Sequence, residues 1–149
     1  MSGDDGHPGP SIEVSNRQDR TMDIAGLIEL ARTSLRSEGV DRGELSVSLV
    51  DDDEMTELHR RFMDEDGPTD VLSFPMDDND EDGDGGRLIG DVVIDPAEAA
   101  RHHPDDPDRE VRLLLVHGIL HLLGYDHEED DERAAMWARQ ERYSGVRVP

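Results

Sequence analysis

Cysteine is absent from the 149-residue chain. Its absence excludes disulfide bonds and thiolate zinc ligands, so histidine, aspartate and glutamate are the side chains available to bind a metal. Apolar runs are also short. None approaches the roughly 18 residues of a membrane-spanning helix, and the first residues contain neither the basic nor the apolar segment of a signal peptide. We therefore expect a cytoplasmic protein with no membrane partner.

Basic residues are scarce, with 15 Lys and Arg against 38 Asp and Glu, which gives a formal net charge of -23. Such a charge repels free nucleic acid at long range and suits basic protein partners better. Much of the excess lies in two acidic runs, at 77–84 and 126–132, which are typical of solvated surface. A function that involves nucleic acid therefore requires contacts that overcome this charge repulsion.

The length is that of one domain with a sizeable core rather than of two domains. Residues 1–10 lack periodicity and predict a disordered tail, while residues 11–149 predict a single domain. Within this domain, residues 76–87 are acidic and rich in glycine, so we expect a mobile loop there.

Alternation of apolar and polar residues predicts strands at 12–16 and 45–49. Residues 71–74, between a turn and Pro75, and the apolar run at 88–94 predict a third and a fourth strand. The last two strands are expected to form a hairpin across the acidic loop. Together with the helices below, this order predicts an α+β fold, in which a mixed sheet of about four strands packs against about five helices.

Helical spacing predicts a first helix that begins at Thr21 or Asp23 and a second that begins at Asp53. The expected buried stripe of the second helix consists of Met55, Leu58 and Phe62. A short helix follows at about 97–102. Asp106, which is followed by Pro107, predicts the start of a buried helix that continues to about 123. A last helix at about 131–143 should pack over it.

Three histidines, His117, His121 and His127, are spaced H-x-x-x-H-x-x-G-x-x-H. The first two would lie one helical turn apart and could reach one metal ion, whereas a continued helix would carry His127 to another face. Gly124 can end the helix and turn the chain back. Three histidine nitrogens with a fourth position open to water are typical of a catalytic zinc site. The alternative, a purely structural cluster, leaves imidazoles unpaired among apolar side chains, at a cost of about 1 to 3 kcal/mol each.

The same spacing occurs in metzincin proteases, but Gly118 stands where those enzymes carry their general-base glutamate. A peptidase is therefore disfavoured, while a hydrolytic zinc is not. The other histidines fit no ligand spacing with the first three, and we expect them at the surface: His7, His59, His102 and His103.

Three segments resemble motifs of one known family. Residues 117–127 read HGILHLLGYDH, residues 68–75 read PTDVLSFP, and residues 90–94 read GDVVI. They are similar to the H-G-x-L-H-L-x-G-Y-D-H, P-T-D-V-L-S-F-P and G-D-I-V-I motifs of the YbeY family of endoribonucleases, also called rRNA maturation factors.

The resemblance implies a zincin-like α+β fold and zinc-dependent cleavage of single-stranded RNA. It places this activity in maturation of the 3′ end of 16S rRNA and in ribosome quality control, together with small ribosomal subunit components and an assembly GTPase. DNA is not among the implied partners. The implied ligands of one Zn2+ ion are His117, His121 and His127.

The resemblance also leaves questions of mechanism open. Asp70, Ser73 and Asp126 match family motifs and are candidates to orient water or a ligand imidazole. Equally, Asp70 and Ser73 could complete a turn and Asp126 could cap the site loop. No side-chain base is required, because zinc can lower the pKa of its bound water or polarise a phosphoryl oxygen, and RNA has its own 2′-hydroxyl nucleophile.

Aligning the chain on Asp66 places Met63 where many relatives carry an arginine proposed to hold phosphate. Together with the charge of -23, this favours a second hypothesis. In it, the protein is a metal-stabilised ribosome assembly factor that binds small-subunit proteins or rRNA without cutting.

Overall fold

The computed structural model describes residues 9–75, 88–125 and 130–144, with the side chains at 130–133, 135 and 137 left out of the description. The predicted tail at 1–8, the acidic loop at 76–87, Asp126 and His127 lie outside these residues. The described elements are, in chain order, β1 (Ser11–Asn16), α1 (Ile24–Ser37), β2 (Glu44–Leu49), α2 (Asp52–Met63), β3 (Val71–Pro75), β4 (Leu88–Ile94), α3 (Pro96–His102), α4 (Pro107–Leu122) and α5 (Asp130–Ser144). The predicted α+β fold is confirmed.

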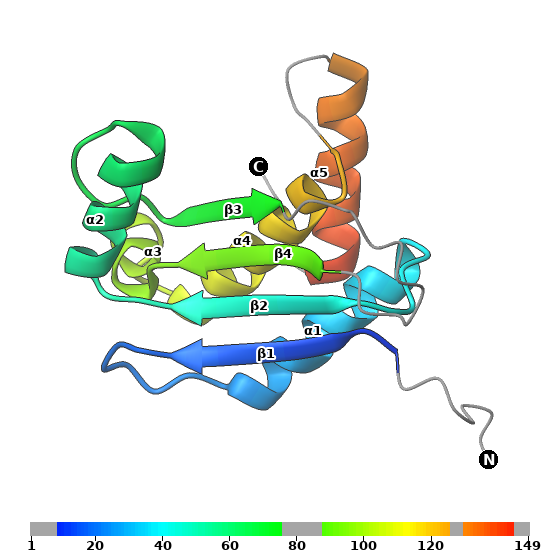
Figure 1. Cartoon of the computed structure of the whole chain (residues 1–149), viewed down its shortest axis with the longest axis horizontal. Helices are drawn as coiled ribbons and strands as arrows, with labels where there is room; N and C mark the ends of the chain where they lie inside the picture. The colour runs from blue at the N-terminus through cyan, green and yellow to red at the C-terminus, as the bar shows by residue number, and fades with distance from the viewer. Residues whose placement is uncertain (1–8, 76–87, 126–129, 145–149) are drawn as a thin grey trace.

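The described strands form one four-stranded sheet in the order β1-β2-β4-β3 (Figure 1). β1, β2 and β4 are parallel, and β3 runs antiparallel to β4 at the edge of the sheet. Val71 of β3 faces Ile94, and Pro75 faces Gly90. The prediction that the third and fourth strands pair is therefore confirmed.

The two faces of the sheet bury their side chains in separate hydrophobic clusters. Leu45, Val47 and Leu49 of β2 are buried in the main core, to which α1 and α4 contribute their apolar faces. In β4, Val92 belongs to this core, while its neighbour Val93 packs in a smaller cluster on the other side. This split follows from the alternation of side chains along a strand. No helix in the described part of the chain is long and apolar enough to cross a membrane.

α4 lies at the centre of the packing, between the sheet and α5, and also contacts α1 and α3 (Figure 1). It begins as predicted, because the carboxylate of Asp106 accepts a hydrogen bond from the backbone N–H of Arg109 at 3.2 Å and Pro107 occupies the first turn. α5 packs against α4 through buried Met136, which confirms the expected placement of the last helix.

α2 differs from the prediction in two respects. Its N-cap is Asp51 rather than Asp53, because Asp51 has an extended backbone and its carboxylate accepts from Glu54 N–H at 2.9 Å. Met55 is fully buried as expected, but Phe62 is 55% exposed. Phe62 packs edge-on against Phe74 of β3 instead of entering the core, so it stays more than half exposed.

Candidate functional site

His117 and His121 lie side by side near the end of α4, with ring centroids 4.5 Å apart and ring planes at 74°. The helix ends at Leu122, and Gly124 has a φ of 102°, which favours glycine. The backbone N–H of Gly124 donates to His121 O at 3.0 Å, and that of Tyr125 donates to Leu120 O at 3.0 Å. The predicted break at Gly124 is thus confirmed.

The orientation of His117 is fixed from α5. Its Nδ1 donates to Oε1 of Gln140 at 2.7 Å, and the Gln140 side chain is buried. A neutral imidazole that donates from Nδ1 keeps Nε2 unprotonated, which is the form that binds a metal. Nothing in the sequence pattern pointed to Gln140, because its role depends on how α5 is rotated against α4.

A groove of about 500 Å³ runs beside these histidines. This histidine groove is lined by residues 71–75 of β3, by Phe62 and Met63 at the end of α2, and by His117 and His121. Phe62 and Met63 are each more than half exposed, and the Phe62 ring meets that of Phe74 edge-on at 5.1 Å. The groove therefore combines two potential metal ligands with an exposed apolar surface.

Ser73 and Gly118 hold β3 against α4 inside the groove. Ser73 Oγ donates to the backbone oxygen of Gly118 at 3.4 Å. A Cβ atom at position 118 would lie 2.8 Å from Cγ1 of Val92 and 3.3 Å from Ser73 Oγ. A side chain at 118 would therefore press into the sheet, which is why a glutamate in the protease position has no room here.

The remaining histidines are only partly where we expected them. His103 is exposed, as predicted. The prediction for His59 is wrong, since its side chain is 13% exposed and its Nδ1 lies 2.9 Å from Gly67 O. His102 is about half exposed but belongs to a cluster. His7 lies outside the described residues.

That cluster consists of Asp70, His102 and Glu110, whose nearest ligand atoms all lie within 4.8 Å of one another. Asp70 precedes β3, His102 ends α3, and Glu110 is in the first turns of α4. Such a group is compatible with metal binding. None of its three residues lines the histidine groove, so Ser73 is the candidate that the structure places beside His117 and His121, while Asp70 belongs to this cluster.

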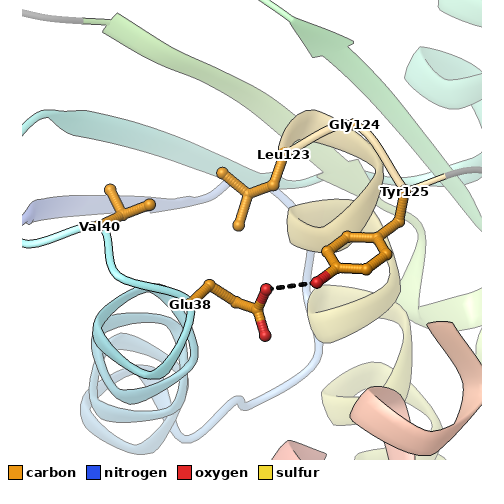
Figure 2. A pocket seen from close by; sticks show the side chains of 5 residues that line it. All are labelled: Glu38, Val40, Leu123, Gly124 and Tyr125. Atoms are coloured by element: carbon orange, nitrogen blue, oxygen red, sulfur yellow. Dashed lines mark hydrogen bonds between the residues drawn. The ribbon is translucent and has the colours of Figure 1, made fainter. Parts of the chain in front are cut away.

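A second pocket, of about 400 Å³, lies at the turn after α4 and is lined by Glu38, Val40, Leu123, Gly124 and Tyr125 (Figure 2). Glu38 accepts hydrogen bonds from Tyr125 OH at 2.7 Å, from Arg139 Nε at 3.0 Å and from Tyr143 OH. Burial acts to raise the pKa of Glu38, but the bonds from Tyr143 and Tyr125 and the charge on Arg139 lower it overall. Glu38 thereby joins α1 and α5 to Tyr125, next to the segment that carries Asp126 and His127.

Asp95 directly follows β4 and is fully buried. Its Oδ1 caps α3 by accepting from the backbone N–H groups of Ala97 and Glu98. Its Oδ2 has no hydrogen-bond partner among the described residues. Burial, together with the neighbouring Asp52, raises the pKa of Asp95 to about 7.

The chain is similar to known proteins over most of its length. The family model described as Endoribonuclease YbeY matches residues 13–145. A protein of that name from Acidothermus cellulolyticus is 47% identical over 142 residues, which cover 87% of each chain. Another from Streptomyces coelicolor is 43% identical over 141 residues, 87% of this chain and 86% of that one. The solution structure of TM1509 from Thermotoga maritima is 31% identical, covers 89% of this chain and 86% of its own, and superposes with a TM-score of 0.58.

Proposed function

This chain belongs to the endoribonuclease YbeY family, and on that premise we propose that it is a zinc-dependent endoribonuclease that cuts single-stranded RNA. The proposed ligands of one zinc ion are His117, His121 and His127. The observation that carries the proposal is the pair His117 and His121, set one turn apart beside a groove, with the tautomer of His117 fixed by Gln140.

The described residues fit a zinc ion. Zinc prefers imidazole nitrogens at about 2.0 to 2.1 Å, and a ligating histidine usually donates its other N–H to an acceptor, as His117 does to Gln140. The break at Gly124 turns the chain back, which His127 needs if it is to join the same ion. When bound, zinc would supply Lewis-acid stabilisation to a phosphodiester cleavage.

The chain's own residues supply positioning. Gln140 holds the ring of His117, and the bond from Ser73 to the backbone of position 118 keeps β3 beside the histidines. Glu38 anchors Tyr125 just before the segment that carries His127. The contacts of Gln140 and Ser73 thus hold the histidines and β3 on the two sides of the groove before RNA binds.

RNA binding to an acidic chain is supported by the exposed apolar end of α2. Base stacking on an aromatic ring contributes about 1 to 3 kcal/mol per base and needs no positive charge. Phe62, which is exposed at the groove, offers such a ring. Stacking can replace part of the phosphate contact that an arginine at the position of Met63 would make.

By family resemblance, the proposed substrate is the 3′ end of 16S rRNA, and the proposed setting is ribosome quality control in the cytoplasm. Small-subunit components and an assembly GTPase are the proposed partners. The net charge of -23 favours a second candidate, an assembly factor that binds basic ribosomal proteins and does not cut RNA.

The test compares wild type with His121→Ala for cleavage of a single-stranded RNA and for binding to small ribosomal subunits. His103→Ala, at an exposed histidine outside the groove, is the matched control. The nuclease proposal predicts that only His121→Ala loses cleavage. Binding without cleavage above background in the wild type would instead favour the assembly factor.

A further inference from the structure

Asp70, His102 and Glu110 bring together ligands from the turn before β3, the end of α3 and the first turns of α4. The nearest oxygen of each carboxylate and a ring nitrogen of His102 lie within 4.8 Å of one another. Two carboxylates and one imidazole that converge in this way form a common donor set for a divalent metal ion.

The contacts of His102 identify its ligand atom. Nδ1 lies 3.5 Å from Oδ2 of Asp70, whereas Nε2 lies 3.3 Å from Oε2 of Glu98, on the other side of the ring. Nδ1 therefore faces the cluster, and Nε2 faces the carboxylate of Glu98. Metal-binding histidines commonly make this contact with a carboxylate, which fixes the tautomer and raises the basicity of the ligating nitrogen. Arg101 in turn holds Glu98.

The charge in the cluster points to a cation. Glu110 is 9% exposed, and the carboxylate of Asp70 lies close to it. Its ion-pair partner is His103, at 3.3 Å, and that of Asp70 is His102. Imidazoles carry a positive charge only when protonated. A metal ion would neutralise both carboxylates without requiring either histidine to be protonated.

We propose that Asp70, His102 and Glu110 form a second metal site, which binds a divalent transition-metal ion such as Zn2+. The imidazole ligand favours such an ion over Mg2+ or Ca2+, which prefer all-oxygen sites. The site is independent of the proposed histidine centre. Glu110 precedes His117 by seven residues on α4, about 10 Å along the helix axis, whereas metals that share one substrate lie about 3.5 to 4 Å apart.

The second site ties the start of β3 and the end of α3 to α4. An ion that binds only the folded state stabilises it by mass action. The site therefore raises the melting temperature and holds in place the helix that carries His117 and His121.

The experiment is a Zn2+ titration of the full metal-free chain, with the bound stoichiometry measured by calorimetry and by elemental analysis after dialysis. The wild type is expected to bind two ions, and His102→Ala and His121→Ala one each, while the double variant binds neither. Asp70→Asn, which keeps the side-chain shape, should also lose one ion, so the result does not depend on the folding of His102→Ala. His103→Ala, next to the proposed ligand, is the matched control and should keep two.

The proposal is overturned if His102→Ala and Asp70→Asn bind as many ions as the wild type, or if His103→Ala loses an ion as well. A wild type that binds one ion, lost in His102→Ala and kept in His121→Ala, would support the second site and contradict the histidine centre. The melting temperature gives a second readout, since Zn2+ should raise it less in His102→Ala than in His103→Ala.

Discussion

Replacing Asp95 with asparagine should make the protein more stable at alkaline pH. The Asp95 carboxyl is fully buried, and its Oδ2 has no hydrogen-bond partner in the described part of the chain. Asparagine can keep the cap on α3 through its Oδ1. Its amide N–H can donate to Asp52, whose own pKa is lowered by Arg101. The variant thus mimics the protonated acid at every pH.

The size of the effect follows from linkage. The pKa of Asp95 is about 7 in the folded protein, against 3.8 for an ordinary aspartate. Between these values the folded state holds a proton that the unfolded state has lost, so the stability of the wild type falls as pH rises from about 4 to 7. Each pKa unit corresponds to about 1.4 kcal/mol. Asp95 and Asp52 interact, so part of this pKa difference belongs to the pair and not to Asp95 alone. We therefore expect the wild type to lose about 2 to 4 kcal/mol of stability in total.

Urea denaturation of wild type and Asp95→Asn, followed by circular dichroism at several pH values, measures this difference. The two proteins should be similar near pH 4, and the variant should be more stable by about 2 to 4 kcal/mol at pH 8. Asp23→Asn, at the exposed N-cap of α1, is the control and should follow the wild-type profile. Parallel profiles for Asp95→Asn and wild type would refute the reasoning.

Three further predictions concern the groove. Gly118→Ala should destabilise the protein by about 1 kcal/mol, since overpacking against Val92 costs about 1 to 3 kcal/mol and helix propensity returns about 1. In a Val92→Ala background the same change should become stabilising, and a double-mutant cycle without this change of sign would contradict the close approach. Gln140→Leu should weaken zinc binding by about 10- to 100-fold in a chelator competition, and an unchanged affinity would exclude its role in positioning His117. Phe62→Ala should raise KM for single-stranded RNA by about 5-fold or more with kcat kept, while Phe62→Trp should restore it, and equal KM values would exclude stacking.

Local signals in the sequence predicted most of the fold. Alternation placed β2 because one face of this strand enters the core, and an apolar run placed β4, which is buried on both faces. Asp106 with its proline, and Gly124, set the ends of α4 because caps and positive φ act over a few residues. The same reasoning misplaced the N-cap of α2 by two residues, because each of three consecutive aspartates can cap a helix. The extended backbone of Asp51 after β2 decides which of them is the N-cap.

The parts that sequence reasoning missed depend on how elements meet in space. Phe62 continues the apolar stripe of α2, yet it packs against Phe74 of the edge strand β3 and stays more than half exposed. Gln140 contacts His117 only through the packing of α5 on α4. His102 and Glu110 join Asp70 from three elements, and no spacing along the chain encodes that meeting.

The most direct test of the central claim is the zinc content of His127→Ala, measured by elemental analysis beside His121→Ala and His103→Ala. The account predicts that His127→Ala loses the same zinc ion as His121→Ala and, with it, the cleavage of single-stranded RNA, while His103→Ala keeps both. If His127→Ala retained its full zinc content and cleaved RNA like the wild type, the three-histidine centre would be contradicted.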